Sequence, residues 1–278
     1  MAIIIALDTF TDTNRNLSAH TPDLGFGSWT YSGAANEWQI ISNQASKTFT
    51  DNNTQFCRSD LDIADDDFEV FADYNNSGSG CFAGERAGLY MLAHKSTAIA
   101  NGEGVEVLFR LAVSGSTFRI EVIRRDSAGV EQQNVLLGTV VITSGQSLRL
   151  GAMVSGLDVQ VWTEPAGGGT RTNRGAAVTL TADLRDGNHK RIGLTGRTEC
   201  NAPRSTMDNL TVTVVLPPTG QVQFAASIQN AFGGRVQVSS SIVVRRFVPE
   251  SDQFSPGVHF DGLNPRFYRG SSFQRRDS

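Results

Sequence analysis

Two neighbouring segments of the chain alternate apolar and polar residues with a period of two. Val105–Leu111 and Thr117–Arg124 both place valine, isoleucine or phenylalanine at every second position, with charged residues among the positions between. Because successive side chains of a strand point to opposite faces, this period predicts two half-buried β-strands. The Ser-Gly-Ser tract at 114–116 is typical of a hairpin turn, so we expect the two strands to pair.

The same short apolar segments, separated by Gly, Ser, Asn and Asp, recur along most of the chain. Helical periodicity is not sustained anywhere, and a short helix near Glu131 is the one exception that we consider. The 278 residues suffice for one large all-β domain, alone or with an appendage. We therefore predict an all-β fold, an antiparallel two-sheet sandwich. The further predicted strands are Ile3–Leu7, Phe68–Tyr74, Ala87–Ala93, Asn134–Ile142, Leu148–Val154, Leu157–Thr163, Ile192–Thr195 and Asn209–Leu216.

A boundary is predicted at Pro217–Pro218, because a sheet interior does not accept consecutive prolines. Residues 1–216 have a net charge of −7, whereas residues 217–278 have a net charge of +3. We expect the first range to be one domain and the second a C-terminal extension. In the extension, 221–247 predicts a β-hairpin and 248–278 predicts an extended arm. A lone hairpin is marginally stable, so it must pack on the domain or join another chain's sheet.

Aromatic and arginine side chains recur in the extension among Gly, Pro and Ser. Such a polar, irregular segment cannot form its own core, and Arg and aromatic residues anchor protein interfaces. These residues therefore predict an assembly interface: Arg245, Arg246, Phe254, Phe260, Arg266, Phe267, Tyr268 and Phe273.

Composition narrows the classes of function. The net charge of −4 disfavours a nucleic-acid partner, because such binding is driven by phosphate neutralisation. No apolar run is long enough to span a membrane, and Ile3–Leu7 reads as a strand rather than a signal peptide. The three cysteines are an odd number, which favours free thiols; a Cys57–Cys81 bridge is the alternative.

The opening residues resemble a known family. Asp8-Thr9-Phe10-Thr11-Asp12, then 17–23 with the sequence LSAHTPD, then Gly27-Ser28-Trp29 are similar to the start of concanavalin A-like lectin and laminin-G jelly rolls, in particular copies in phage structural proteins. The resemblance covers residues 7–216 and implies two packed antiparallel sheets. It also implies a role in binding glycans or in building virion surfaces.

Three of these residues are interpreted as structural. We expect His20 to bond the backbone and Trp29 to cap the core, all close to Asp8; a ligand role for His20 is the alternative. Asp8 and Asp208 are expected to accept backbone N–H bonds at strand ends, which favours their ionised form.

Motifs for catalysis are missing from the sequence. Glycosidases of this fold carry paired carboxylates as E-x-D-x-x-E on one strand, and this pattern does not occur. Glu103 and Glu106 are read as turn and surface positions, and the glycines at 167–169 as a flexible turn. The acidic run at 65–67 predicts a solvated turn, with a calcium site as the alternative. We expect no catalytic residue, no cofactor and no metal.

Binding of a glycan remains open at this stage. A sugar platform needs an exposed aromatic ring with amide groups beside it, and Trp38 or Tyr74 with Asn75 and Asn76 is the candidate set. Core packing of these rings is the competing interpretation.

The combined hypothesis is a non-enzymatic phage virion structural protein, a capsid decoration, cement or head-fibre protein that docks through its C-terminal arm. A tail-associated phage protein and a soluble glycan-binding module are the alternatives. The expected location is the virion, assembled in the host cytoplasm. The expected partners are the major capsid protein or tail components, copies of the same chain and a host-surface glycan, with neither nucleic acid nor membrane.

Overall fold

The computed structural model describes residues 2–33, 37–48, 53–63, 67–78, 84–112, 116–198, 205–215, 225–231, 235–241, 258–261 and 264–267. The chain divides into two compact units, Met1–Leu216 and Pro217–Ser278. We refer to them as the body and the C-terminal unit, and describe each by itself.

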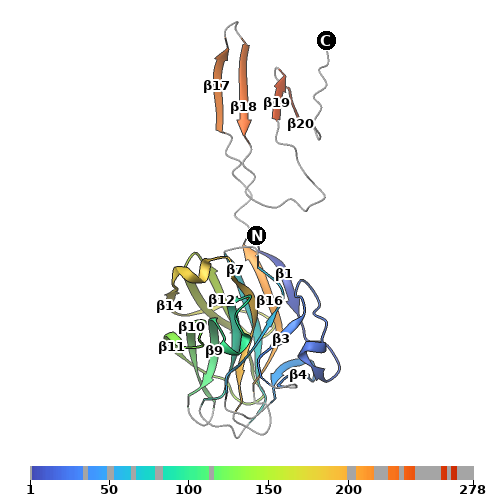
Figure 1. Cartoon of the computed structure of the whole chain (residues 1–278), viewed down its shortest axis with the longest axis vertical. Helices are drawn as coiled ribbons and strands as arrows, with labels where there is room; N and C mark the ends of the chain where they lie inside the picture. The colour runs from blue at the N-terminus through green and yellow to red at the C-terminus, as the bar shows by residue number, and fades with distance from the viewer. Residues whose placement is uncertain are drawn as a thin grey trace. The chain divides into compact units, whose positions relative to one another are not determined.

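The body is built from two antiparallel sheets, coloured blue to orange in Figure 1. Sheet A has β7 and β16 at its centre, and β1 (Ala2–Asp8) pairs with β16 outside the main order. Its main order is β14 (Thr172–Thr179), β13 (Asp158–Pro165), β12 (Ser147–Ser155), β7 (Phe68–Asn76), β16 (Ser205–Val215), β5 (Gln44–Lys47), β4 (Trp38–Ile41) and β2 (Arg15–Asn16).

Three 3₁₀ turns, η1 (Leu17–Ala19), η2 (Ile99–Asn101) and η3 (Ala182–Arg185), are the helical elements in the described part of the chain.

Sheet B packs against sheet A. The order of sheet B is β11 (Glu131–Val141), β10 (Thr117–Arg125), β9 (Gly104–Leu111), β8 (Arg86–His94), β15 (His189–Arg197), β6 (Gln55–Ser59) and β3 (Trp29–Tyr31).

The chain passes between the sheets several times. It changes sheet before and after β3, before and after β6, between β7 and β8, between β11 and β12, and before and after β15. The strands at the two ends of the body, β1 and β16, are antiparallel neighbours, with Asp8 opposite Leu210. Early and late parts of the sequence are therefore joined at the centre of sheet A.

The apolar faces of the two sheets form one core. Tyr74 of β7 lies between Phe109 and Phe118 of sheet B, with ring centroids 5.0 and 5.6 Å apart. Burying aliphatic and aromatic surface between two sheets is the main force that holds such a sandwich together. Cys57 lies in this core as a free thiol, which agrees with the favoured reading of free cysteines, and burial raises its pKa. Cys81 and Cys200 lie outside the described residues.

The prediction of an all-β, antiparallel two-sheet sandwich is confirmed, and so is the pairing of the strands on either side of residues 114–116. The short helix considered near Glu131 is wrong. Glu131 begins β11, where its carboxylate lies 2.6 Å from Arg125 Nη2 on the paired strand. No helix in the described residues is long and apolar enough to cross a membrane.

The C-terminal unit contains its own sheet, in the order β17-β18-β19-β20. The predicted hairpin is present as β17 (Ala225–Ala231) and β18 (Arg235–Ser241). The predicted extended arm contains a second hairpin, β19 (Val258–Asp261) and β20 (Asn264–Phe267), which the sequence analysis missed.

The predicted interface residues fall partly on these strands. Phe260 is in β19, and Arg266 and Phe267 are in β20. The remaining members lie outside the described residues: Arg245, Arg246, Phe254, Tyr268 and Phe273.

Candidate functional site

A buried carboxylate at the end of β1 gathers the residues of the opening motif. Asp8 Oδ1 lies 2.8 Å from His20 Nε2 and accepts the Phe10 backbone N–H at 2.8 Å. Asp8 Oδ2 accepts the indole N–H of Trp29 at 2.9 Å. Asp8, His20 and Trp29 are all buried, so the predicted close cluster with a largely buried Trp29 is confirmed.

Two details of this cluster differ from expectation. The second ring nitrogen of His20 lies 3.1 Å from Asp12 Oδ2, so the ring contacts two carboxylates rather than the backbone. Burial raises the pKa of Asp8 above its usual value, although His20 and the N–H donors act in the opposite direction. The sequence analysis expected backbone N–H bonds to favour the ionised form of Asp8. That expectation did not take the burial of Asp8 into account.

The residues proposed as a sugar platform are packed into the body. Tyr74 is 0% exposed and Trp38 is 1% exposed, so neither ring offers a face on which a sugar could stack. Asn76 is also buried, and its side-chain N–H donates to the Ile142 carbonyl at 2.6 Å. Asn75 lies on the opposite face of β7 and pairs with Ser147. The structure corrects this candidate set, because the strand alternation separates its members.

A polar and aromatic surface lies instead on the outward face of sheet A, across β13, β12, β7 and β16. The strand registers arrange its residues in three rows, and we call it the sheet A face. The rows are Glu164, Arg149, Asp73 and Asp208; then Trp162, Gly151, Phe71 and Thr211; then Gln160, Met153, Glu69 and Thr213.

Three carboxylates of the sheet A face are bound by arginine. Arg149 donates to Asp73 at 2.7 and 3.2 Å and to Glu164 at 3.0 Å. The Arg171 guanidinium donates to both oxygens of Glu69, at 2.5 and 3.3 Å. The second oxygen of Glu164 accepts from Arg171 Nε at 3.4 Å. A general acid or base needs an oxygen that is available to a reacting proton. All six carboxylate oxygens here already accept hydrogen bonds from Arg149 or Arg171. This arrangement favours a structural or binding role for the surface.

The aromatic rings of the sheet A face are also covered by arginine. Trp162 lies flat on Gly151, where a Cβ atom would stand 2.1 Å from the indole. Arg171 lies over the Trp162 ring at 3.9 Å, and Arg149 lies over Phe71 at 4.9 Å. Such cation–π contacts compete with any sugar for the ring face.

Asp208 differs from the other carboxylates of this surface. Burial, together with the nearby charges of Asp73 and Asp8, raises the pKa of Asp208 to about 6, although the Asn209 N–H bond opposes the shift. The expected backbone bond is confirmed, because Asp208 Oδ1 accepts the Asn209 N–H at 2.7 Å.

This shift predicts a pH dependence of stability. Between the unfolded-state pKa of about 4 and the folded-state value of about 6, the native protein holds a proton that the unfolded chain has released. The contribution of Asp208 to the free energy of unfolding is therefore present at pH 4 and is lost as the pH rises through 6. We expect Asp208→Asn to gain stability relative to the wild type over this range, measured by urea unfolding.

The control for this experiment is Asp126→Asn. Asp126 has a lowered pKa, with the Val130 backbone N–H bond as its largest cause, so its contribution is lost as the pH falls. Equal pH profiles for the wild type and Asp208→Asn would contradict the prediction.

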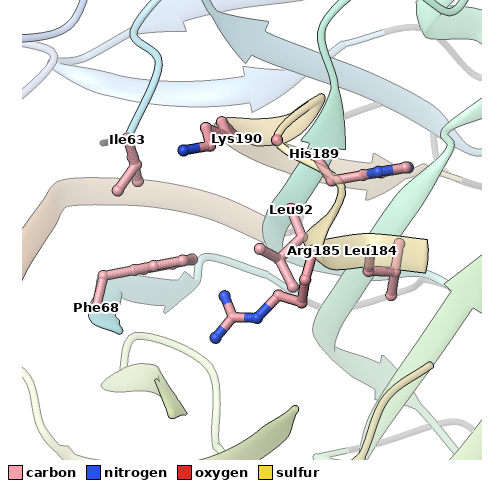
Figure 2. Close-up of a pocket in the computed structure, with 8 residues that line it drawn as sticks. Ile63, Phe68, Leu92, Leu184, Arg185, His189 and Lys190 are labelled. Atoms are coloured by element: carbon pink, nitrogen blue, oxygen red, sulfur yellow. The ribbon is translucent and has the colours of Figure 1, made fainter. Parts of the chain in front are cut away.

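Figure 2 shows a small cavity between β15, η3 and the residues around Ile63. Phe68 and Arg185 reach into this space, whereas the His189 ring points away from it. Its volume of about 10 Å³ is that of one water molecule, too small for a sugar ring. The His189 ring instead lies 3.2 Å from Glu103 and 3.0 Å from Asp186. Within the described part of the chain, no group of His, Cys, Asp and Glu is arranged to hold a metal ion.

Glu106 is not the surface residue that was expected. It points outward from β9 but is fully buried, and it accepts from Arg125 Nε at 2.8 Å and from the Thr195 hydroxyl at 2.6 Å. The glycines at 167–169 do form a turn, in which the Gly168 N–H donates to the Pro165 carbonyl at 3.1 Å. Of the acidic run at 65–67, the described Asp67 caps the Gly156 N–H at 2.8 Å.

No family model and no curated protein matches the chain. It is similar to the metal-free exoplasmic/lumenal domain of VIP36, at 11% identity over 68% of this chain and 85% of that one, with a TM-score of 0.49. It is also similar to the CBM2 module of the evolved Dit of Lactobacillus casei BL23 phage J-1, at 10% identity over 76% and 95%, with a TM-score of 0.47.

A third similar structure is a mutant of the GH43 protein BlXynB from Bacillus licheniformis, at 15% identity and a TM-score of 0.47. The match covers 76% of this chain and 39% of the GH43 chain. At these identities and TM-scores the comparisons assign neither a family nor a function. The body is an antiparallel two-sheet sandwich.

Proposed function

We propose that this chain is a non-enzymatic virion structural protein, a capsid decoration, cement or head-fibre protein. In this proposal the lectin-like body is displayed, and the C-terminal unit docks on the major capsid protein, on tail components or on copies of the same chain. The observation that carries the proposal is the division of the chain into a complete sandwich and a separate unit with its own sheet.

The C-terminal unit has features suited to docking. β17 and β20 are the outermost strands of its sheet, and outer strands offer backbone N–H and C=O groups to a strand of a partner. The unit has a net charge of +3, whereas residues 1–216 have a net charge of −7. The acidic body of a neighbouring copy is therefore a complementary surface.

The non-enzymatic part of the proposal is supported by the sheet A face. Its carboxylates Glu69, Asp73 and Glu164 are held in ion pairs by two arginines, Arg149 and Arg171. Paired carboxylates of a glycosidase need different pKa values and room for a substrate between them. Arg149 occupies the space between Asp73 and Glu164 instead.

Removal of residues 217–278 tests the docking role. We expect the full chain to join particles or oligomers, and the truncated chain to remain a folded monomer by circular dichroism and analytical ultracentrifugation. A full-length variant with Arg245→Glu and Arg246→Glu serves as the matched comparison, because it keeps the unit and reverses two charges. It should lose affinity while remaining folded.

Two results would contradict the proposal. The truncated chain could assemble with unchanged affinity, or the full-length chain could remain monomeric and bind no virion protein.

A further inference from the structure

Four arginines stand directly opposite one another on the outward face of sheet B. The strand registers pair Arg119 of β10 with Arg110 of β9, Arg110 with Arg86 of β8, and Arg86 with Arg197 of β15. Neighbouring strands are about 4.8 Å apart, so the four residues form a straight row across the sheet. We call these four residues the arginine row.

Such a row opposes the stability of the sheet. Like charges directly opposite each other on adjacent strands repel, and sheets usually alternate charge across such positions. Arg110 Nη1 has a carboxylate at 3.4 Å, Glu121 on β10. Two further acids act on Arg86: Glu106, which is bound by Arg125 and Thr195, and Glu131, which is bound by Arg125. The row therefore places like charges side by side on an otherwise acidic body.

Arg86 is the most unusual member of the row. It is 5% exposed, and its guanidinium makes no hydrogen bond or ion pair in the described structure. Burial lowers its pKa, an effect that Glu106 opposes and that Arg125 and Arg110 reinforce. A buried guanidinium that lacks acceptors is costly unless a bound anion supplies them.

We propose that the arginine row binds a linear polysaccharide that carries carboxylate groups. The planar guanidinium fork matches a carboxylate in two parallel hydrogen bonds. A straight row of regularly spaced guanidinium groups suits a polymer with repeated charges better than one small anion. A nucleic acid is an outcome that the experiment below distinguishes, because its phosphates could meet the same guanidinium groups. This inference does not depend on the assembly role of the C-terminal unit.

Titration of the full-length chain with fluorescently labelled polygalacturonate oligomers tests the proposal. We expect saturable binding that weakens with salt, and no binding of the neutral polymer pullulan. Arg86→Gln with Arg110→Gln should weaken binding by about tenfold or more, because charge-assisted hydrogen bonds are lost. Arg15→Gln removes one exposed charge of sheet A and should leave the affinity unchanged.

Thermal unfolding separates a binding role from a structural one. Without ligand, Arg86→Met should keep or raise the Tm, because a buried unpaired charge has been removed. With polygalacturonate, the Tm of the wild type should rise and that of Arg86→Met should not. A lower Tm for ligand-free Arg86→Met would assign Arg86 a structural role and overturn the proposal.

Three further results would also overturn it. The wild type could fail to bind polygalacturonate, or the double variant could bind it as tightly as the wild type. Single-stranded DNA or dextran sulfate could also bind more tightly than polygalacturonate, with the same loss in the double variant, which would replace the carboxylated polysaccharide by a phosphate or sulfate polymer.

Discussion

Replacing Trp29 by alanine is expected to lower the free energy of unfolding by about 3–5 kcal/mol, because a buried aromatic ring is exchanged for a cavity. Trp29 packs against Phe10 and Phe26, with ring centroids 5.9 and 5.4 Å away. The change also removes the indole N–H that Asp8 Oδ2 accepts at 2.9 Å, which leaves a buried carboxyl oxygen without that donor. Guanidinium unfolding monitored by circular dichroism measures the loss.

Trp29→Phe is the matched control. It keeps most of the ring packing and removes only the N–H donor, so its loss should be clearly smaller. If Trp29→Ala unfolds at the midpoint of the wild type, the cluster around Asp8 does not stabilise the end of β1.

Replacing Arg149 by methionine is expected to cost about 3–5 kcal/mol at pH 7, because Asp73 and Glu164 would remain buried without their shared cation. Methionine retains much of the apolar stem, so the loss reports on charge rather than on packing. Urea unfolding at pH 7 measures the loss.

Two variants control this experiment. Arg15→Met breaks the exposed pair with Asp12 and should cost less than about 1 kcal/mol. Arg149→Met combined with Asp73→Asn should recover part of the stability, because one of the two stranded charges is removed. A loss in Arg149→Met no larger than in Arg15→Met would mean that solvent already screens the sheet A face.

Part of the sheet A face could be predicted from the sequence. Alternation in Phe68–Tyr74 places Glu69, Phe71 and Asp73 on one face of a strand, opposite the core residues. The arginines that bind the two carboxylates, Arg149 and Arg171, lie 76 and 102 residues further along the chain. No local pattern shows which strands become neighbours, so the neutralisation of these carboxylates was not predictable.

The burial of outward-facing residues could not be predicted from the sequence either. The period of two correctly places Glu106 on the outer face of β9, and the prediction of an exposed position followed from that. The side chains of Arg125 on β10 and Thr195 on β15 hydrogen-bond to it, the latter from two strands away. The face of the sheet to which a side chain points is set locally by the alternation. Its exposure depends on the side chains that other strands place around it.

The sequence by itself determined the all-β class, most strands of the body, the boundary near Pro217 and the first hairpin of the C-terminal unit. These features follow from alternation, turn residues and proline, which act over a few neighbouring residues. Tertiary structure alone decided the order of strands and their register. The arginine row exists only because β10, β9, β8 and β15 are adjacent and aligned so that Arg119, Arg110, Arg86 and Arg197 meet. Sheet pairing is set by packing over the whole core, so residues more than 100 positions apart become neighbours that no local pattern records.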